Sequence, residues 1–225
     1  MRVFDAGFNQ VQFLDGTIYA NTKTRDAFKD AQQNLWIGDN DQGLIKWNGQ
    51  SPVEKIHPDG PISSLVSALG LEKNILWVAH SGKDPKWSNY YRGAAISKLQ
   101  DNEWSSYNSS NVKLFDSTGF FDVMSLAVDP SDPLHVYIGS AGDGLMDFYN
   151  NDARTYYREH NSTLLPMVGN PGQVKVQGLR FDDKGNLWMI NSGTSSFVNV
   201  LLNTGQWKRF NVTTFGNPFA GQLYY

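Results

Sequence analysis

The stretch "FDDKGNLWM" (residues 181–189) decides the fold, because its centre recurs in "QNLWIG" (residues 33–38). Looser copies occur at "ILWVA" (75–79) and "HVYIG" (135–139). Self-similarity along a chain indicates a repeat protein, in which one supersecondary unit recurs and stacks on its neighbours. The four stretches should therefore share further elements.

Each copy has the same kind of surroundings. Apolar stretches precede three of them, at "ISSL" (62–65), "VMSL" (123–126) and "VQGL" (176–179). Turn-forming residues separate two of these stretches from the aromatic, at "VDPSDPLH" (128–135) and "DDKGN" (182–186). Two short apolar runs around such a turn predict a β-hairpin.

Two further strands are predicted after each aromatic. The third strand lies in "DNDQGLIKW" (39–47), "RGAAISKL" (92–99), "GDGLMDFY" (142–149) and "SSFVNVLL" (195–202). The fourth lies in "EWSSY" (103–107), "RTYYRE" (154–159) and "QWKRF" (206–210). Aromatics on the second and fourth strands are 19 residues apart in two units and 27 in another, where "KDPKWSNYYR" (83–92) is inserted.

Units of four antiparallel strands predict an all-β protein, a β-propeller of which about four to five blades are visible and whose ring is incomplete. The second-strand anchors are Trp36, Trp77, Tyr137 and Trp188, and the fourth-strand anchors are Trp104, Tyr156 and Trp207. One blade cannot bury both of its faces, so we expect the anchors to pack against the next blade. A β-sandwich with chance "LW" pairs is the alternative, and a solenoid fits the long, turn-rich units less well.

The expected units span residues 34–61, 62–111, 112–164 and 165–212, with a tail at 213–225, as one propeller domain or a fragment of a larger one. Residues 1–33 fit less well. "VQFLDGTIYAN" (11–21) resembles the start of another blade, but only 17 residues separate Tyr19 from Trp36. We therefore expect the chain to be irregular or discontinuous between Asn21 and Gln33.

Composition excludes several functions. The net charge of -3 and pI near 5.8 leave no basic stripe for nucleic acid. The absence of cysteine excludes disulfides and thiol catalysis. No apolar run is long enough for a membrane span, and the first ten residues contain no signal-peptide core.

Motifs for catalysis, cofactors or metals are also missing. No nucleophile motif is present, and the histidines, which are His57, His80, His135 and His160, show no metal-ligand spacing. Acidic pairs such as Asp39 with Asp41 and Asp182 with Asp183 could suggest calcium, but turn formation accounts for them better. We expect a non-enzymatic protein without cofactor. A propeller lyase or glycosidase stays as an alternative, because sequence cannot reveal paired carboxylates.

The inserted loop is the candidate binding site. Its aromatic and cationic residues are Lys83, Lys86, Trp87, Tyr90, Tyr91 and Arg92. Exposed aromatic rings suit stacking on sugars, and cations suit phosphate or carboxylate groups. In the alternative interpretation, these aromatics pack on the neighbouring blade.

The motifs "GNLWxxN", "GDGL", "GQWKRF" and "DPSDPLHVYIGSAGDGL" resemble the two-component-regulator propeller repeat of Bacteroidetes-type bacteria. More narrowly, residues 123–210, with "EHNSTL" (159–164) and "GLRFDDKGNLWMINSG" (178–193), are similar to the N-terminal propeller of the PorZ family of type IX secretion. Members of that family carry two propellers and a sorting domain. We therefore expect this chain to be part of a longer protein.

The narrower resemblance implies an exported protein at the cell surface or in the periplasm. It implies a non-catalytic recognition module that binds anionic lipopolysaccharide and assists a sortase-like peptidase of the attachment complex. The broader resemblance leaves a second interpretation open, the periplasmic ligand-sensing propeller of a hybrid two-component sensor.

Overall fold

A computed structural model describes residues 2–4, 7–13, 23–40, 42–49, 54–56, 59–83, 86 and 88–211. Nearly all of its regular structure is β, and the chain divides into two compact units, Met1–Asp59 and Gly60–Tyr225. Every four-stranded sheet is an antiparallel meander in which consecutive strands are neighbours. This is the predicted blade of a β-propeller.

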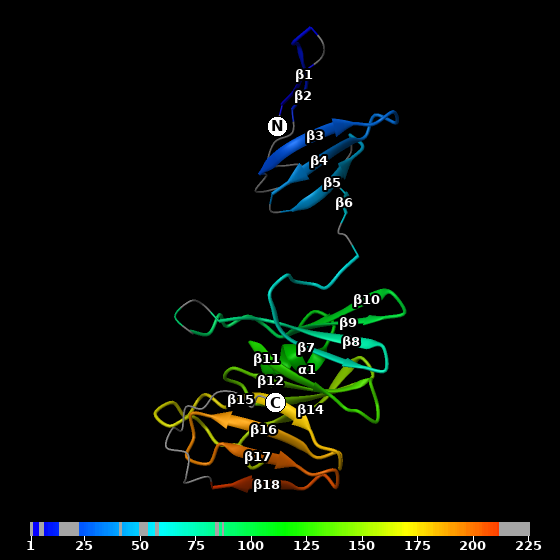
Figure 1. Cartoon of the computed structure of the whole chain (residues 1–225). Coiled ribbons are helices and arrows are strands. Elements are labelled where there is room, and N and C mark those ends of the chain that lie inside the picture. The colour runs from blue at the N-terminus through cyan, green and yellow to red at the C-terminus, as the bar shows by residue number, and fades with distance from the viewer. Residues whose placement is uncertain are drawn as a thin grey trace. The chain divides into compact units, whose positions relative to one another are not determined.

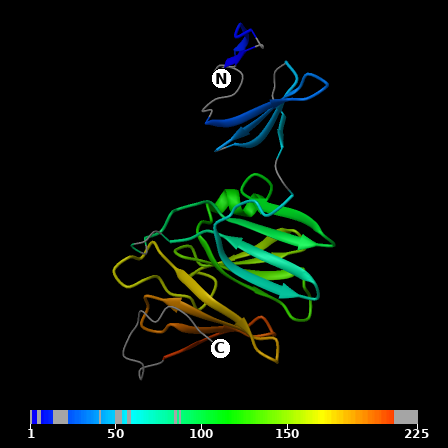
Figure 2. The same cartoon turned by 45° about the horizontal axis from the view of Figure 1, so that its top comes forward.

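The second unit contains three of these sheets (Figures 1 and 2). Its strands are β7 (Val66–Glu72), β8 (Ile75–His80), β9 (Ala95–Gln100), β10 (Glu103–Asn108), β11 (Val123–Val128), β12 (His135–Ser140), β13 (Leu145–Tyr149), β14 (Asp152–Tyr157), β15 (Lys175–Phe181), β16 (Leu187–Ser192), β17 (Val198–Leu201) and β18 (Trp207–Phe210). The first strand of the middle sheet, β11, packs beside both β7 and β15. First strands that gather side by side are the innermost strands of successive blades.

The first unit contains a hairpin of β1 (Arg2–Phe4) and β2 (Gln10–Phe13) and one four-stranded sheet. The sheet consists of β3 (Thr24–Lys29), β4 (Leu35–Asp39), β5 (Gly43–Trp47) and β6 (Glu54–Ile56). Its first strand corrects the sequence analysis, which expected residues 21–33 to be irregular. Five of the six residues of β3 are exposed, so no apolar pattern marked this strand. Part of the expected break, residues 21–22, lies outside the described residues.

A second correction concerns "ISSL" (62–65), which was predicted as a first strand. The strand β7 begins only at Val66, directly after that stretch. Residues 62–65 form a bent segment instead, in which the backbone N–H of Leu65 donates to the Ser63 hydroxyl at 3.1 Å. The equivalent stretches at 123–126 and 176–179 do lie in the strands β11 and β15.

The aromatic anchors take equivalent places, as predicted. The second strands β4, β8, β12 and β16 carry Trp36, Trp77, Tyr137 and Trp188, and the fourth strands β10, β14 and β18 carry Trp104, Tyr156 and Trp207. Trp77 is fully buried against the β11–β14 sheet, and Tyr137 is 8% exposed against the β15–β18 sheet. The expected packing on the next blade is therefore confirmed for these two anchors. The other two second-strand anchors, Trp36 and Trp188, are half-buried.

A carboxylate explains why "NLW" is repeated so closely. Asp182 accepts hydrogen bonds from the backbone and side-chain nitrogens of Asn186 at 2.8 and 2.9 Å, and from the Trp188 indole at 2.8 Å. Asp30 makes the same three bonds, with equal lengths, to Asn34 and Trp36. The repeated unit is thus Asp-x-x-x-Asn-Leu-Trp, in which the aspartate closes the turn and fixes the indole. The turn interpretation of Asp182 is confirmed.

The core between the first two sheets of the second unit contains an element that the sequence analysis missed. The short helix α1 (Lys113–Thr118) lies in the connection between these sheets and buries Phe115, which is 1% exposed, in their core. The Phe115 ring stacks on Phe148 at 5.9 Å, and Phe148 meets the edge of Trp77 at 5.7 Å. Aromatic contacts of this kind add to the free energy gained by burial.

The next pair of sheets approaches so closely that one position requires glycine. A Cβ atom at Gly139 of β12 would lie 2.5 Å from the carbonyl oxygen of Val176 in β15. That distance is far below van der Waals contact, and the obstacle is backbone that cannot rotate away. The glycine in "HVYIG" therefore permits this blade contact.

The burial difference between two anchors predicts unequal losses of stability. We expect Trp77→Ala to lower the free energy of unfolding by about 3–5 kcal/mol, the usual range for a large core aromatic, because the side chain is wholly enclosed. Trp188→Ala should cost less, because that indole is half-buried already. Urea denaturation measures both variants, and equal losses would contradict the assignment of Trp77 as the inter-blade anchor.

The aspartate turn predicts a pH dependence. Burial alone would raise the pKa of Asp182, but hydrogen bonds from Asn186 and Trp188 outweigh it and lower the pKa from 3.8 to about 2. A carboxylate whose pKa is lower in the folded state stabilises the fold when the pH is above its unfolded-state pKa. This contribution disappears as the pH falls from about 4 to about 2.

We therefore expect Asp182→Asn to have a lower thermal midpoint than wild type at neutral pH. The difference should shrink across that acidic window. The matched control is Asp183→Asn, which changes an exposed neighbouring carboxylate and should match wild type throughout. A difference that stays constant down to pH about 2 would contradict the stabilising role of the Asp182 charge.

Candidate functional site

The inserted loop joins β8 to β9. It lies at the end of the strands opposite the turn between β7 and β8 (Figure 1). Of the predicted ligand-binding residues, the structure describes Lys83, Lys86, Tyr90, Tyr91 and Arg92. The sixth, Trp87, lies outside the described residues.

A buried carboxylate holds the end of this loop. Asp122 is 0% exposed and accepts hydrogen bonds from the backbone N–H groups of Tyr91 at 2.9 Å and Arg92 at 3.0 Å. The Ser81 hydroxyl donates to the same carboxylate at 3.0 Å. The backbone N–H of Asp122 in turn donates to the Arg92 carbonyl at 2.8 Å. The loop end is therefore fixed by contacts that link both of its sides.

The side chains at this end point outward. Tyr91 is 66% exposed and Tyr90 is 40% exposed. The guanidinium of Arg92 lies over the Tyr90 ring at 4.8 Å, while the Tyr91 ring lies 5.4 Å from that of Phe121. Arg92 itself is exposed. The loop thus displays two aromatic rings and a cation, rather than burying all of its aromatics on the neighbouring blade.

The two lysines are placed differently. Lys83 is half-buried, and its ammonium donates to the side chain of Asn89 across the base of the loop. The two residues also form an antiparallel bridge, and the Asn89 amide donates to the Ala141 carbonyl at 3.4 Å. Lys86 is exposed. We therefore assign Lys83 to closing the loop, whereas Lys86 lies at the surface.

The arrangement suits the binding of an anion. Arg92 makes no ion pair with any residue that the structure describes, although its guanidinium is held against an aromatic face. A cation stacked in this way keeps its donors free for a carboxylate or phosphate. Next to the loop base lies a cavity of about 430 Å³, which Lys83, Gly82 and the innermost strands β7, β11 and β15 line. A bound chain would have room to continue there.

Sequence reasoning missed Asp122 and Phe121, which support the loop from the segment before β11. Their only sequence signal is "GFFD" (119–122), an aromatic pair followed by a carboxylate at the entrance to a strand. Contacts across about 30 positions of sequence cannot be read from spacing. The fold brings the two segments together through the isolated bridge between Gly93 and Phe121.

The other polar candidates have structural surroundings. His80 is buried and lies 2.8 Å from the Ser97 hydroxyl, while His135 lies between the carboxylates of Asp129 and Asp147. His160 is exposed, and His57 lies outside the described residues. Asp39 accepts backbone N–H bonds from Lys23 and Gln42.

Within the described part of the chain, no group of three or more acidic or histidine side chains could hold a metal ion. Nor does that part contain a helix that is long and apolar enough to cross a membrane.

No protein-family model matches the chain, and no curated protein matches it in sequence. Solved structures do share its fold. PorZ of Porphyromonas gingivalis, described as an essential bacterial surface component of the type IX secretion system, is 20% identical with a TM-score of 0.64. The match includes 92% of this chain but only 27% of the PorZ chain, so this chain spans about a quarter of the length of PorZ.

Two further solved structures resemble the chain more weakly. The extracellular domain of a putative hybrid two-component system from B. thetaiotaomicron is 14% identical, with a TM-score of 0.46 over 84% of this chain and 28% of its own. Virginiamycin B lyase of Staphylococcus aureus is 9% identical, with a TM-score of 0.46 over 93% of this chain and 62% of its own. The fold shared with PorZ agrees with the narrower resemblance proposed from the sequence.

The carboxylate that supports the loop should be needed for its stability. Asp122→Asn places an amide donor opposite the N–H groups of Tyr91 or Arg92, so a buried donor loses its acceptor. We expect a loss of about 1–3 kcal/mol in the free energy of unfolding. The control Asp116→Asn changes an exposed carboxylate of α1 and should leave stability unchanged. Equal stability of both variants would contradict the anchoring role of Asp122.

Proposed function

We propose that this chain is a non-catalytic recognition module of an exported protein, comparable in role to PorZ, and that its β8–β9 loop binds anionic lipopolysaccharide. One observation carries the proposal. The guanidinium of Arg92 is exposed, stacked on Tyr90 and without an ion-pair partner among the described residues, while a buried carboxylate fixes the backbone beneath it. A cation held ready in this way recognises an anionic group.

The aromatic rings make a glycan the fitting carrier of that anionic group. Tyr90 and Tyr91 are both exposed, and flat aromatic faces pack against the C–H faces of pyranose rings. Arg92 lies directly beside these rings, so one ligand could contact both its sugar face and its charge. Lipopolysaccharides with phosphate or uronate groups combine these two features.

A binding role also agrees with the state of Asp122, the carboxylate that supports the loop end. Asp122 is fully buried and accepts three hydrogen bonds, so its oxygens are occupied by loop and backbone donors. A general acid or base must instead reach its substrate. The further proposal that the module assists a sortase-like peptidase at the cell surface rests on the resemblance to the PorZ family.

Binding of purified anionic lipopolysaccharide tests this proposal. We expect Arg92→Ala and Tyr91→Ala each to weaken binding about tenfold, which is about 1.4 kcal/mol, without changing the thermal midpoint. Binding should also weaken as salt rises, because the contact is an exposed ionic one. Surface plasmon resonance at two ionic strengths measures both effects.

The matched control is Arg209→Ala, which removes an exposed arginine from β18 whose guanidinium donates to the Thr163 carbonyl. It should bind like wild type. If Arg92→Ala folds normally and binds the lipopolysaccharide as wild type does, the loop is not the ligand site.

A further inference from the structure

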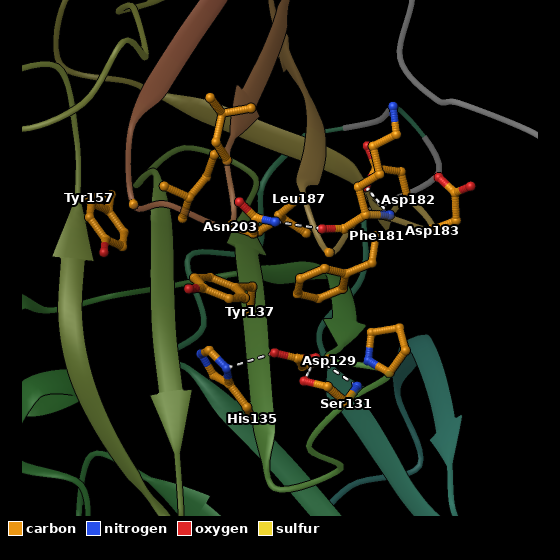
Figure 3. Close-up of a pocket in the computed structure, with 16 residues that line it drawn as sticks. Asp129, Ser131, His135, Tyr137, Tyr157, Phe181, Asp182, Asp183, Leu187 and Asn203 are labelled. Atoms are coloured by element: carbon orange, nitrogen blue, oxygen red, sulfur yellow. Dashed lines mark hydrogen bonds and ion pairs between the residues drawn. The ribbon is translucent and has the colours of Figure 1, made fainter.

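A second cavity lies at the opposite edge of the second unit, between the β11–β14 and β15–β18 sheets (Figure 3). Its volume is about 660 Å³, and it is open to solvent. The walls come from the β11–β12 turn, the β15–β16 turn, the β17–β18 turn and Tyr157 of β14. Pockets for small ligands typically enclose roughly 300–1000 Å³, so the size suits a ligand.

The cavity exists where the repeat departs from its own pattern. Three of the four second-strand anchors are tryptophan, and the fourth is Tyr137. At the preceding sheet contact, Trp77 is wholly buried and its indole N–H donates to the Pro133 carbonyl in the next sheet's turn at 2.9 Å. Tyrosine is smaller and carries no indole. The equivalent space beside Tyr137 is therefore left open.

Tyr137 presents an unused polar group to this space. The residue is 8% exposed, and its hydroxyl has no hydrogen-bond partner in the part of the chain that the structure describes. Its ring is fixed between His135, at 4.8 Å, and Phe181, at 6.0 Å (Figure 3). Burial raises the pKa of Tyr137, so the phenol stays protonated and can donate at neutral pH.

The charged groups around the cavity are already neutralised or bonded. The carboxylate of Asp129 accepts bonds from its own turn and lies 3.2 Å from His135. That of Asp182 accepts bonds from its turn and from Trp188. At the rim, Asp183 and Lys184 are exposed and carry opposite charges. The walls therefore offer an aromatic face and a hydroxyl, while the charged groups without such hydrogen bonds lie at the exposed rim.

We propose that this cavity binds an uncharged sugar residue, which packs on the Tyr137 and Phe181 rings and accepts a hydrogen bond from the Tyr137 hydroxyl. An apolar ligand would leave that hydroxyl without a partner. An anionic ligand would meet the carboxylates of Asp129, Asp182 and Asp183, and a cationic ligand would find two of these three already hydrogen-bonded. A polyhydroxylated neutral ring satisfies both conditions. The site is independent of the β8–β9 loop, since it lies at the other end of the strands.

Saturation-transfer NMR on the full chain with maltotriose, cellotriose and mannotriose tests the proposal. We expect at least one of these uncharged trisaccharides to bind, and Tyr137→Phe to weaken that binding at least fivefold. This variant removes one oxygen atom and keeps the ring, so its packing against Phe181 is preserved. The control Tyr90→Phe, on the loop, should bind the trisaccharide like wild type.

A second variant covers the case in which Tyr137→Phe is not stably folded. Asp183→Trp places a large side chain at the exposed rim and should likewise abolish binding. No binding by any of the three trisaccharides would overturn the proposal, as would binding that persists in a folded Tyr137→Phe variant or in Asp183→Trp. Lipopolysaccharide binding at the loop should be unchanged in these variants, so failure of one proposal can be told from failure of the other.

Discussion

The covering of one aromatic side chain by the next sheet is the contact on which this structure depends. A four-stranded sheet has two faces, and alone it leaves both of them in water. Trp77 and Tyr137 remove that exposure by packing against the following sheet. Gly139 lets two sheets approach closely enough, and Phe115 fills the space that the connection would leave. The spacing of the repeat follows from this contact.

Because the sheets pack on one another through their faces, the loops and turns at the ends of the strands can vary without disturbing that packing. One edge carries a long loop, whose end is fixed to Asp122 and which displays Arg92 beside two tyrosines. The other edge carries short turns closed by aspartates, such as Asp182, and the cavity beside Tyr137. The two edges therefore differ in chemistry. One presents the Arg92 cation, which makes no ion pair with a described residue, and the other presents aromatic rings and the Tyr137 hydroxyl among hydrogen-bonded carboxylates.

The β-propeller supports binding and catalysis alike, so function must be inferred from the residues at the edges rather than from the fold. In this chain the Asp122 carboxylate at the loop end is occupied in holding backbone, while the adjacent Arg92 makes no ion pair with a described residue. The proposed recognition role rests on that division between the two side chains.

The sequence by itself determined the repeated four-stranded units and the strands on which the anchors lie, because turn residues and aromatics recur at matching intervals. It did not reveal β3, whose residues are almost all exposed and so show no apolar alternation. It could not reveal the bond between Asp122 and the loop, or the cavity left by a tyrosine at a tryptophan position. Both depend on which side chains of distant segments meet in space, and only the tertiary packing of one sheet on another decides that.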